Sequence, residues 1–277
     1  MGLQLRVYDS NFSQTLMEPV KVQNPQRVQQ GATPRLCVVY TAKDSMRTLP
    51  RSIASVRLLA DRIIVLDSGS VDGTIDASRA LGAEVVHQDW LGYARQKQRA
   101  IDLAAGSEFV LLLDSDEIPD ERLLEAIRSA MKSPGNIQGW WIDRRFWFAG
   151  GYVRIGSPDR VLRLFRTGAG SIPEREVHEV VVVAGPTARL SGLCRHESWV
   201  DLDDALSRQL RYARLAASIP GARSNLRKLL INPPWAFFRH YILCRSIFDG
   251  WRGFLLSIVI AAGTLEKHLL ILAKDDR

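Results

Sequence analysis

Two clusters of acidic and small polar residues each follow a short apolar run. One of them, Asp114-Ser115-Asp116-Glu117, follows residues 109–113 and places Asp114 and Asp116 at alternate positions. Two carboxylates at this spacing can converge on one Mg²⁺ or Mn²⁺ ion, which also accepts phosphate oxygens as ligands. A cation held there would neutralise a departing diphosphate. The alternative is a solvated turn that caps a helix beginning near Pro119.

The other cluster, Asp67-Ser68-Gly69-Ser70-Val71-Asp72-Gly73-Thr74, follows residues 62–66. Gly69 and Gly73 permit tight turns, and the exposed N–H groups of a following helix suit a polar or anionic ligand. Asp67 can accept hydrogen bonds from a nucleobase or a ribose. The alternative is an ordinary loop whose polar side chains cap the next helix. Neither cluster identifies a site by itself.

The apolar periodicity around these clusters predicts alternating strands and helices. Strands are expected at residues 35–41, 62–66, 84–87 and 109–113, with helices at 46–59, 74–81 and 93–105 between them. Strands and helices that alternate at this spacing form a parallel sheet covered on both faces. In such sheets ligands bind at the carboxyl ends of the strands. Both acidic clusters lie at those ends, which favours a binding site.

The rest of the chain follows other patterns. After Pro134 the sequence has β-like runs at residues 139–148, 161–165 and 177–183, and from residue 201 it is helical and basic. The first 33 residues are rich in Gln, Asn and Val and punctuated by prolines. We therefore expect an N-terminal extension over 1–33, an α/β domain over 34–200 and a helical region over 201–277.

Composition limits the class of protein. The chain has 277 residues, 46% of them hydrophobic, which is enough for a sizeable core. Its net charge of +7 favours anionic partners: nucleic acid, phosphorylated ligands or an acidic membrane surface. Three widely spaced cysteines without a C-x-x-C pair argue against a cysteine zinc site and a disulfide framework. The uncharged run 253–265 has 13 residues, fewer than the roughly 18–20 that span a bilayer, which argues against a membrane-spanning anchor.

The C-terminal region mixes aromatic and basic residues. The aromatic residues are Trp235, Phe237, Phe238, Tyr241, Phe248, Trp251 and Phe254, and the basic residues among them are Arg227, Lys228, Arg239, Arg245 and Arg252. Aromatic rings at headgroup depth and cations against anionic lipid are typical of a membrane interface. The alternative is a helical cap packed on the sheet. We favour a region that lies on an anionic membrane surface.

In combination, the motifs V-L-D-S-G-S-x-D-G-T and L-L-L-D-S-D-E resemble those of the family 2 glycosyltransferases, which have the GT-A fold, a Rossmann-like, mostly parallel sheet flanked by helices. Residues 90–97 are similar to the W-x-G-[FY]-x-x-Q-K segment of the subgroup that includes the lipopolysaccharide core β-1,4-glucosyltransferase. Residues 158–166, 177–179 and 241–253 also resemble this subgroup. The chain departs from it at residues 42–45, Ala-Lys-Asp-Ser, where T-K-N-E is usual. This departure leaves the exact donor and acceptor open.

The resemblance implies a role for each residue that matches a motif. Asp67 and Ser68 would contact the uracil or ribose of a UDP-sugar. Asp114 would contact the ribose or the metal, and Asp116 would ligate the Mg²⁺ or Mn²⁺ that bridges the diphosphate. Lys97 would reach phosphate oxygens, or else belong to a solvated helix face.

The resemblance also implies a carboxylate base, because family 2 enzymes generally invert the anomeric centre. Such a base takes the proton from the acceptor hydroxyl. Glu179 is the first candidate and Asp159 the second. His178 is a candidate to complete the metal site, or else a histidine fixed in a sheet, and His196 is a weaker candidate.

The sequence thus indicates an inverting hexosyltransferase that moves glucose from UDP-glucose to a glycolipid such as the lipopolysaccharide inner core. We expect it in the cytoplasm, peripheral on the inner face of the cell membrane. Three alternatives are a catalytically inactive scaffold of the same fold, a nucleic-acid-binding protein and a sugar nucleotidyltransferase. No nucleic-acid-binding signature is present, and acidic clusters at strand ends would repel phosphate unless a metal intervened. The run 38–44 also lacks the Gly-rich loop of nucleotidyltransferases.

Overall fold

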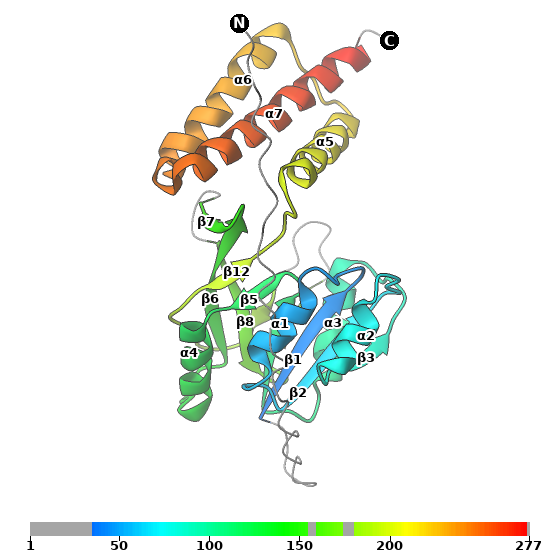
Figure 1. Ribbon diagram of the computed structural model, residues 1–277, viewed down its shortest axis with the longest axis vertical. Helices are drawn as coiled ribbons and strands as arrows, with labels where there is room; N and C mark the ends of the chain where they lie inside the picture. Colours follow the sequence, from blue (N-terminus) through cyan, green and yellow to red (C-terminus); the bar gives the residue numbers. More distant parts are fainter. Residues whose placement is uncertain (1–34, 155–158, 174–179, 276–277) are drawn as a thin grey trace, which may run out of the picture. The chain divides into compact units, whose positions relative to one another are not determined.

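The computed structural model describes residues 35–154, 159–173 and 180–275 of the chain. At its centre is a sheet whose first strands are parallel and lie in the order β3-β2-β1-β4 (Figure 1). These strands are β1 Leu36–Ala42, β2 Arg62–Asp67, β3 Glu84–His87 and β4 Phe109–Asp114. β1, β2 and β4 are nearly continuous apolar runs, as expected for strands buried on both faces. The predicted parallel α/β sheet is confirmed.

Beyond β4 the sheet continues mainly with antiparallel pairs. β8, Asp159–Arg166, runs antiparallel both to β4 and to β6, Gly139–Phe148. Shorter strands complete this half: β5 Glu117–Pro119, β7 Gly151–Val153, β11 Thr187–Arg189 and β12 Cys194–His196. A separate ribbon pairs β9 Gly170–Ser171 with β10 Val182–Val183. The sheet as a whole is therefore mixed.

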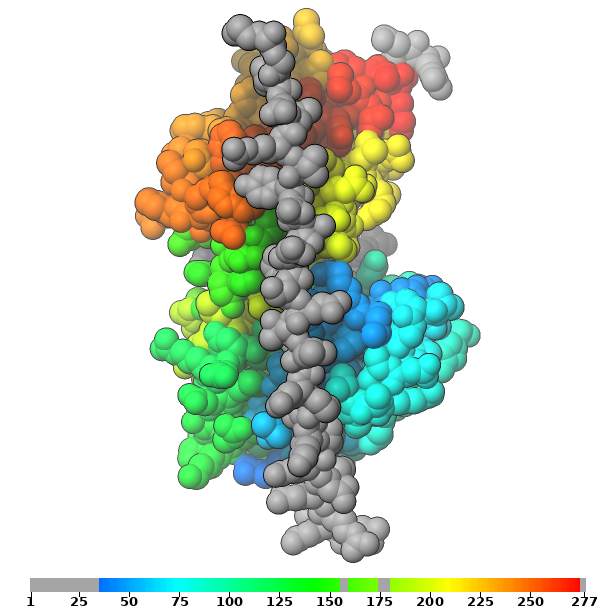
Figure 2. Space-filling model, in the orientation of Figure 1, coloured from blue at the N-terminus to red at the C-terminus, as the bar shows by residue number. Residues whose placement is uncertain are grey.

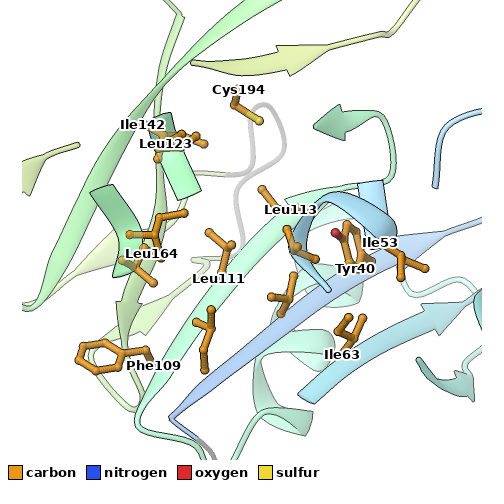
Figure 3. Close-up of a cluster of buried hydrophobic side chains, with 14 of the residues drawn as sticks. Tyr40, Ile53, Ile63, Phe109, Leu111, Leu113, Leu123, Ile142, Leu164 and Cys194 are labelled. Carbon is orange, nitrogen blue, oxygen red and sulfur yellow. The ribbon is translucent and has the colours of Figure 1, made fainter. Parts of the chain in front are cut away.

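Helices cover both faces of the sheet. α1 Leu49–Val56 and α4 Glu121–Lys132 pack on one face, with α2 Thr74–Ala80 beside α1, whereas α3 Tyr93–Leu103 covers the other face. Figure 3 shows the hydrophobic core on the face covered by α1 and α4, where Ile53 of α1 and Leu123 of α4 pack with Leu111 and Leu113 of β4. Burial of each such side chain stabilises the fold by about 1.5–3 kcal/mol. Asp120 caps α4, since its side chain accepts a hydrogen bond from the Leu123 N–H.

Several smaller expectations can be compared with the structure. β6 and β8 confirm the strands predicted at 139–148 and 161–165, whereas the strand predicted at 177–183 is described only from residue 180, with β10 at its end. The sequence does not predict the strands of two or three residues, because so short a segment shows no apolar periodicity. All three cysteines are free thiols. The extension expected at residues 1–33 lies outside the described residues.

The C-terminal region is helical, as predicted. It consists of α5 Leu202–Ser218, α6 Leu226–Phe238, the π-helix η1 Arg239–Leu243, the 3₁₀ turn η2 Ser246–Asp249 and α7 Gly250–Asp275. Asp201 and Asn225 cap α5 and α6 through their side chains. α7 packs against both α5 and α6. Polar contacts reinforce this packing: the imidazole of the buried His268 on α7 is hydrogen-bonded to Ser224 and Asn232 at 2.9 Å each.

Contacts at the tip of β6 and β7 join the helical region to the sheet. Arg154 forms an ion pair with Asp249 at 2.6 Å, and its backbone carbonyl accepts a hydrogen bond from Ser246 Oγ at 2.8 Å. Arg252 Nε donates to the carbonyl of Ala149 at 2.8 Å. These bonds attach η2 and the start of α7 to β7.

Among the described residues, one helical segment is long and apolar enough to cross a membrane. It runs from residue 246 to residue 274, and one third of its most apolar window is buried against protein. The segment exceeds the apolar run seen in the sequence because helix flanks with a few polar residues extend it. Length and composition of this helix are therefore compatible with a spanning helix as well as with a packed one.

Candidate active site

The carboxyl ends of β2 and β4 lie on either side of the end of β1. In the register of the sheet Ala42 pairs with Asp67, and Thr41 pairs with Asp114. Because neighbouring strands are about 4.8 Å apart, the two acidic clusters begin about 10 Å from each other. They therefore meet at one edge of the sheet.

Asp67 is fully buried and organises the loop that follows it. Its Oδ1 accepts hydrogen bonds from the N–H groups of Gly69 and Ser70 at 2.8 Å each, and its Oδ2 accepts one from Ser70 Oγ at 2.5 Å. Gly69 makes the turn possible, since its φ of 88° is rarely adopted by residues with a Cβ. Ser68, next to Asp67, lines the pocket described below, but Asp67 does not. Direct contact between Asp67 and a ligand would require these loop bonds to be exchanged.

Gln96 on α3 fixes a second loop beside the first. It is fully buried, and its Nε2 donates to Ser68 Oγ at 3.0 Å. The same side chain bonds to backbone groups in loop 88–91, at 3.2 and 3.3 Å. This loop carries Trp90, whose ring packs edge-on against that of Tyr93 with 4.8 Å between the centroids. Gln96 thereby holds an exposed aromatic pair next to the end of β2.

Asp114 sits among three cations. Its Oδ1 lies 2.7 Å from Lys97 Nζ, and its Oδ2 lies 2.5 Å from Arg163 Nη2 and 3.5 Å from Arg144 Nη1. Burial alone would raise the pKa of Asp114, but the charges of Arg163, Lys97 and Arg144 outweigh it and hold the pKa well below its usual range. Asp114 is therefore ionised, and both of its oxygens are engaged.

Glu117, the last residue of the second cluster, is a fully buried anchor. Its carboxylate accepts bonds from the Asp114 N–H at 3.1 Å, from Arg144 Nη1 at 2.8 Å and from Arg163 Nη2 at 2.5 Å. Burial would lower the pKa of Arg163, but Asp114 and Glu117 reverse this and raise the pKa, so the guanidinium stays charged. Glu117 thus holds the two arginines that neutralise Asp114.

An open pocket of about 740 Å³ lies where the two clusters meet. Ligand sites commonly have volumes of about 300–1,000 Å³. Of the residues singled out in the sequence for donor and metal binding, the pocket lining contains Ser68, Lys97, Asp114 and Asp116. The lining also includes His196 and the Trp90–Tyr93 pair. The pocket therefore combines carboxylates, a cation and exposed aromatic rings.

Asp116 and His196 form the donor set that best fits a metal. Nε2 of His196 lies 3.4 Å from Oδ2 of Asp116, and both side chains are partly exposed. Mg²⁺ typically binds through one or two protein carboxylates together with substrate phosphates and waters. No group of three or more histidine, cysteine, aspartate or glutamate side chains that could hold a metal occurs in the described part of the chain. The residues thus fit a cation that arrives with a phosphate ligand, and the salt bridges of Asp114 leave it poorly suited to the metal role expected for it.

Of the two candidates for the catalytic base, only Asp159 lies within the described residues. Asp159 is about half exposed, and its Oδ2 accepts a bond from Arg144 Nε at 2.6 Å. It therefore lies across Arg144 from Asp114 and lines a neighbouring cavity, not the pocket with Asp116. Glu179 and His178 lie outside the described residues.

Sequence reasoning missed Arg144, Arg163 and Gln96, and gave His196 little weight. Arg163 had one available signal: it interrupts the apolar strand β8, and a buried arginine almost always has a carboxylate partner. Gln96 lies in the W-x-G-[FY]-x-x-Q-K segment, but the sequence does not indicate what its side chain binds. The proximity of His196 to Asp116 had no sequence signal, because β12 reaches this edge only through its pairing with β5 and β6.

The chain is similar in sequence to known proteins along much of its length. The model of the Glycosyl transferase family 2 matches residues 37–175. The lipopolysaccharide core biosynthesis glycosyltransferase LpsC of Rhizobium meliloti is 30% identical over 80% of this chain and 88% of its own length. An uncharacterized glycosyltransferase of Rickettsia prowazekii, RP128, is 26% identical over 80% of this chain and 81% of its own. A crystal structure of glucosyl-3-phosphoglycerate synthase from Mycobacterium tuberculosis with Mn²⁺, UDP and glucosyl-3-phosphoglycerate matches 41% of this chain and 44% of that chain, with 26% identity and a TM-score of 0.35.

Proposed function

The chain belongs to glycosyl transferase family 2, and from this premise we propose that it transfers a hexose, glucose from UDP-glucose, to a lipid-linked saccharide with inversion. One observation carries the proposal: Ser68, Lys97, Asp114 and Asp116, from separate segments, line a single pocket at the carboxyl ends of the parallel strands. The name of the relative LpsC supports the lipopolysaccharide core as the class of acceptor.

The pocket offers a partner for each part of a sugar nucleotide. The exposed Trp90–Tyr93 pair presents ring surfaces on which a uracil or hexose ring can stack. Ser68 contributes a hydroxyl for the ribose, and Lys97 places a positive charge beside the diphosphate. Asp67 acts through the loop that it shapes, and Asp114 acts by holding Lys97 in place.

Asp116 and His196 would hold Mg²⁺ or Mn²⁺, and the cation would supply positive charge to the diphosphate as it leaves. The remaining steps belong to the acceptor and the base. The acceptor hydroxyl oxygen forms a bond to the anomeric carbon while the bond from that carbon to the UDP oxygen breaks, and UDP takes the electron pair. Glu179 or Asp159 takes the hydroxyl proton. Asp159 is suited to this role by its partial exposure beside Arg144, which leaves one carboxylate oxygen outside the ion pair.

The helical region would keep the enzyme at the inner face of the cell membrane, on the cytoplasmic side. Exposed apolar side chains occur along the whole of α6, among them Leu226, Leu230, Trp235 and Phe238. In Figure 2 α6 and the adjoining turns of α7 (orange) form one continuous outer surface. Arg227 and Lys228 on α6, and Arg239 at the start of η1, are exposed and suit anionic lipid. We thus propose a peripheral region over 201–277, a transferase domain over 34–200, an extension over 1–33 and no nucleic-acid partner.

The function is tested by UDP release from a panel of sugar nucleotides, with and without Mg²⁺ or Mn²⁺, in the presence of a lipopolysaccharide acceptor. We expect metal-dependent release from UDP-glucose. Asp116→Asn should lower the rate on the order of 100-fold or more, because the charge that faces the diphosphate is lost. Glu125→Gln, on the exposed side of α4, is the matched control and should keep the wild-type rate. Full activity of Asp116→Asn would refute the metal assignment, and no turnover of any donor would refute the function.

A further inference from the structure

We call the pocket of about 740 Å³ that contains Asp114 and Asp116 the donor pocket. A second cavity, of about 990 Å³, adjoins it. We call it the arginine cavity after the six arginines in its lining: Arg144, Arg145, Arg154, Arg160, Arg189 and Arg245. They come from β6, β8, β11, the end of β7 and the turn after η1. Segments far apart in the sequence thus deliver one kind of side chain to one concave surface.

The positive charge of this surface exceeds what nearby carboxylates balance. Asp143 and Asp159 are the acidic residues in the lining, and Asp249 pairs with Arg154 from outside it. Arg144 is also paired with Glu117 and Asp114. Among the described residues, neither Arg145 nor Arg245 has a carboxylate within ion-pair distance. The single carboxylate of Asp143 forms ion pairs with two arginines, Arg160 at 3.2 Å and Arg189. A concave surface with such an excess attracts anions.

Arg245 gives a further sign that the side chains are used. It lies between η1 and η2 with φ of 61°, a left-handed conformation that glycine adopts without strain. Strained backbone at a non-glycine residue is found preferentially at functional sites. Arg245 is thus held in this conformation on the wall of a cavity already rich in arginine.

The position of the arginine cavity relates it to both the donor pocket and the helical region. His196, which faces Asp116, lines both cavities. At the other end, residues 243–245 of the helical region line the arginine cavity. Their neighbours Ile242 and Phe248 are exposed apolar residues. The arginine cavity therefore extends from the donor pocket towards the surface proposed to meet lipid.

We propose that the arginine cavity is the acceptor subsite and that it binds a saccharide carrying a phosphate or a carboxylate. The assignment rests on the proposed function, since only a transferase needs an acceptor next to its donor. The planar guanidinium matches carboxylate and phosphate oxygens in a two-bond geometry. A sugar anchored in this way presents its hydroxyl groups to the side where His196 and Asp159 lie, while any lipid portion extends towards η1 and η2.

The test measures binding of glucose 6-phosphate and of glucuronate to the full-length protein by calorimetry, with glucose as the neutral probe. Arg189→Gln and Arg245→Gly are the variants, because the first leaves Asp143 paired with Arg160 and the second relieves the left-handed backbone. Each should weaken binding of the anionic sugars by about tenfold or more, since a hydrogen bond between charged groups is lost. Arg128→Gln, on the exposed side of α4, is the matched control.

UDP binding, measured on the same samples, separates this assignment from the proposed function. Unchanged UDP affinity in the two variants, together with weakened anionic-sugar binding, supports an acceptor subsite. Anionic sugars that bind equally well to the variants, bind no better than glucose, or are displaced by UDP would overturn it. Failure of wild-type protein to bind UDP at all would instead count against the proposed function.

Vesicles distinguish a lipid-borne anionic sugar from a soluble one. The probe is phosphatidylinositol 4-phosphate in phosphatidylcholine, compared with phosphatidylglycerol vesicles of equal charge. A preference for the phosphoinositide that Arg189→Gln abolishes supports a lipid-borne acceptor. Binding of soluble glucose 6-phosphate without that preference supports the same subsite with a soluble acceptor.

Discussion

At the scale of single residues, the four positions Asp114 to Glu117 show how environment separates chemically similar groups. Asp114 is ion-paired on both oxygens, Asp116 faces the pocket with His196, and Glu117 is buried under two arginines. A buried carboxylate tolerates its charge only when cations and N–H groups replace the lost water. The short motif therefore combines side chains that line the pocket with the buried anchor that orders their surroundings.

This division predicts that Glu117 matters for stability. Glu117→Gln should reduce the free energy of unfolding by about 3–5 kcal/mol, because it leaves the buried charge of Arg163 without one of its two carboxylate partners. Urea unfolding followed by fluorescence measures the change. Asp159→Asn removes the exposed carboxylate of the same network and should cost less than about 1 kcal/mol. An unchanged urea midpoint for Glu117→Gln would show that the anchor is dispensable.

At the scale of elements, helix α3 fixes two loops that border the donor pocket. Gln96 bonds at once to Ser68 and to the backbone of loop 88–91. Gln96→Leu should leave those partly buried backbone groups without their partner, at a cost of about 1 kcal/mol in stability. The loosened loops should also weaken UDP binding, which calorimetry can measure. Gln138→Leu, an equal change before β6 at the opposite edge of the sheet, should leave UDP affinity intact.

His240 links η1 to α7, and its burial predicts a stability that depends on pH. It is buried, and its Nδ1 lies 3.0 Å from Ser257 Oγ. Burial lowers the pKa of His240 below its ordinary value, although Asp249 acts in the opposite direction. Below about pH 6.5 the unfolded chain binds the proton and the folded chain does not, so this contribution to stability is present above that pH and is lost as the pH falls.

We accordingly expect the urea midpoint of the wild-type protein to fall between about pH 7.5 and pH 5. In His240→Gln the fall should be smaller, because that variant cannot take up this proton on unfolding. His268 on α7, whose pKa burial also lowers, should retain part of the effect. Parallel pH profiles for the two proteins would mean that His240 does not titrate differently on folding.

At the scale of the whole molecule, a catalytic sheet and an amphipathic helical region share one chain. The exposed apolar side chains of α6 and the cations among them would contribute jointly to binding at a lipid surface. Each basic residue near an anionic membrane contributes on the order of 1 kcal/mol, and salt weakens that contribution. The ion pair of Arg154 with Asp249 joins these helices to the wall of the arginine cavity.

Membrane association is tested by sedimentation with phosphatidylglycerol-containing vesicles. The double variant Arg227→Gln/Lys228→Gln should bind about tenfold or more weakly than wild type, and high salt should reduce the difference. The pair Arg122→Gln/Arg128→Gln, exposed on α4, removes the same charge from the sheet domain and should bind as wild type does. Equal binding of both double variants would point to net charge as the cause, and not to a membrane-facing region.

Much of the fold could be predicted because its determinants are local. Apolar runs at 62–66 and 109–113 end in aspartates, and intervening helical periodicity makes the strands parallel, so Asp67 and Asp114 had to meet at one edge. The turn-forming role of Gly69 and the helical character of the C-terminal region also follow from neighbouring residues alone. Such features need no knowledge of distant partners.

Only the tertiary structure decided what each charged group does. Arg163 and Arg144 reach Asp114 and Glu117 because β8 runs antiparallel to β4 and β6 pairs in turn with β8. His196 reaches Asp116 through the late strand β12. The arginine cavity likewise exists only where separate strands and the end of η1 meet. The fate of a carboxylate depends on the charges and burial around it, and in this protein those come from residues tens of positions away along the chain.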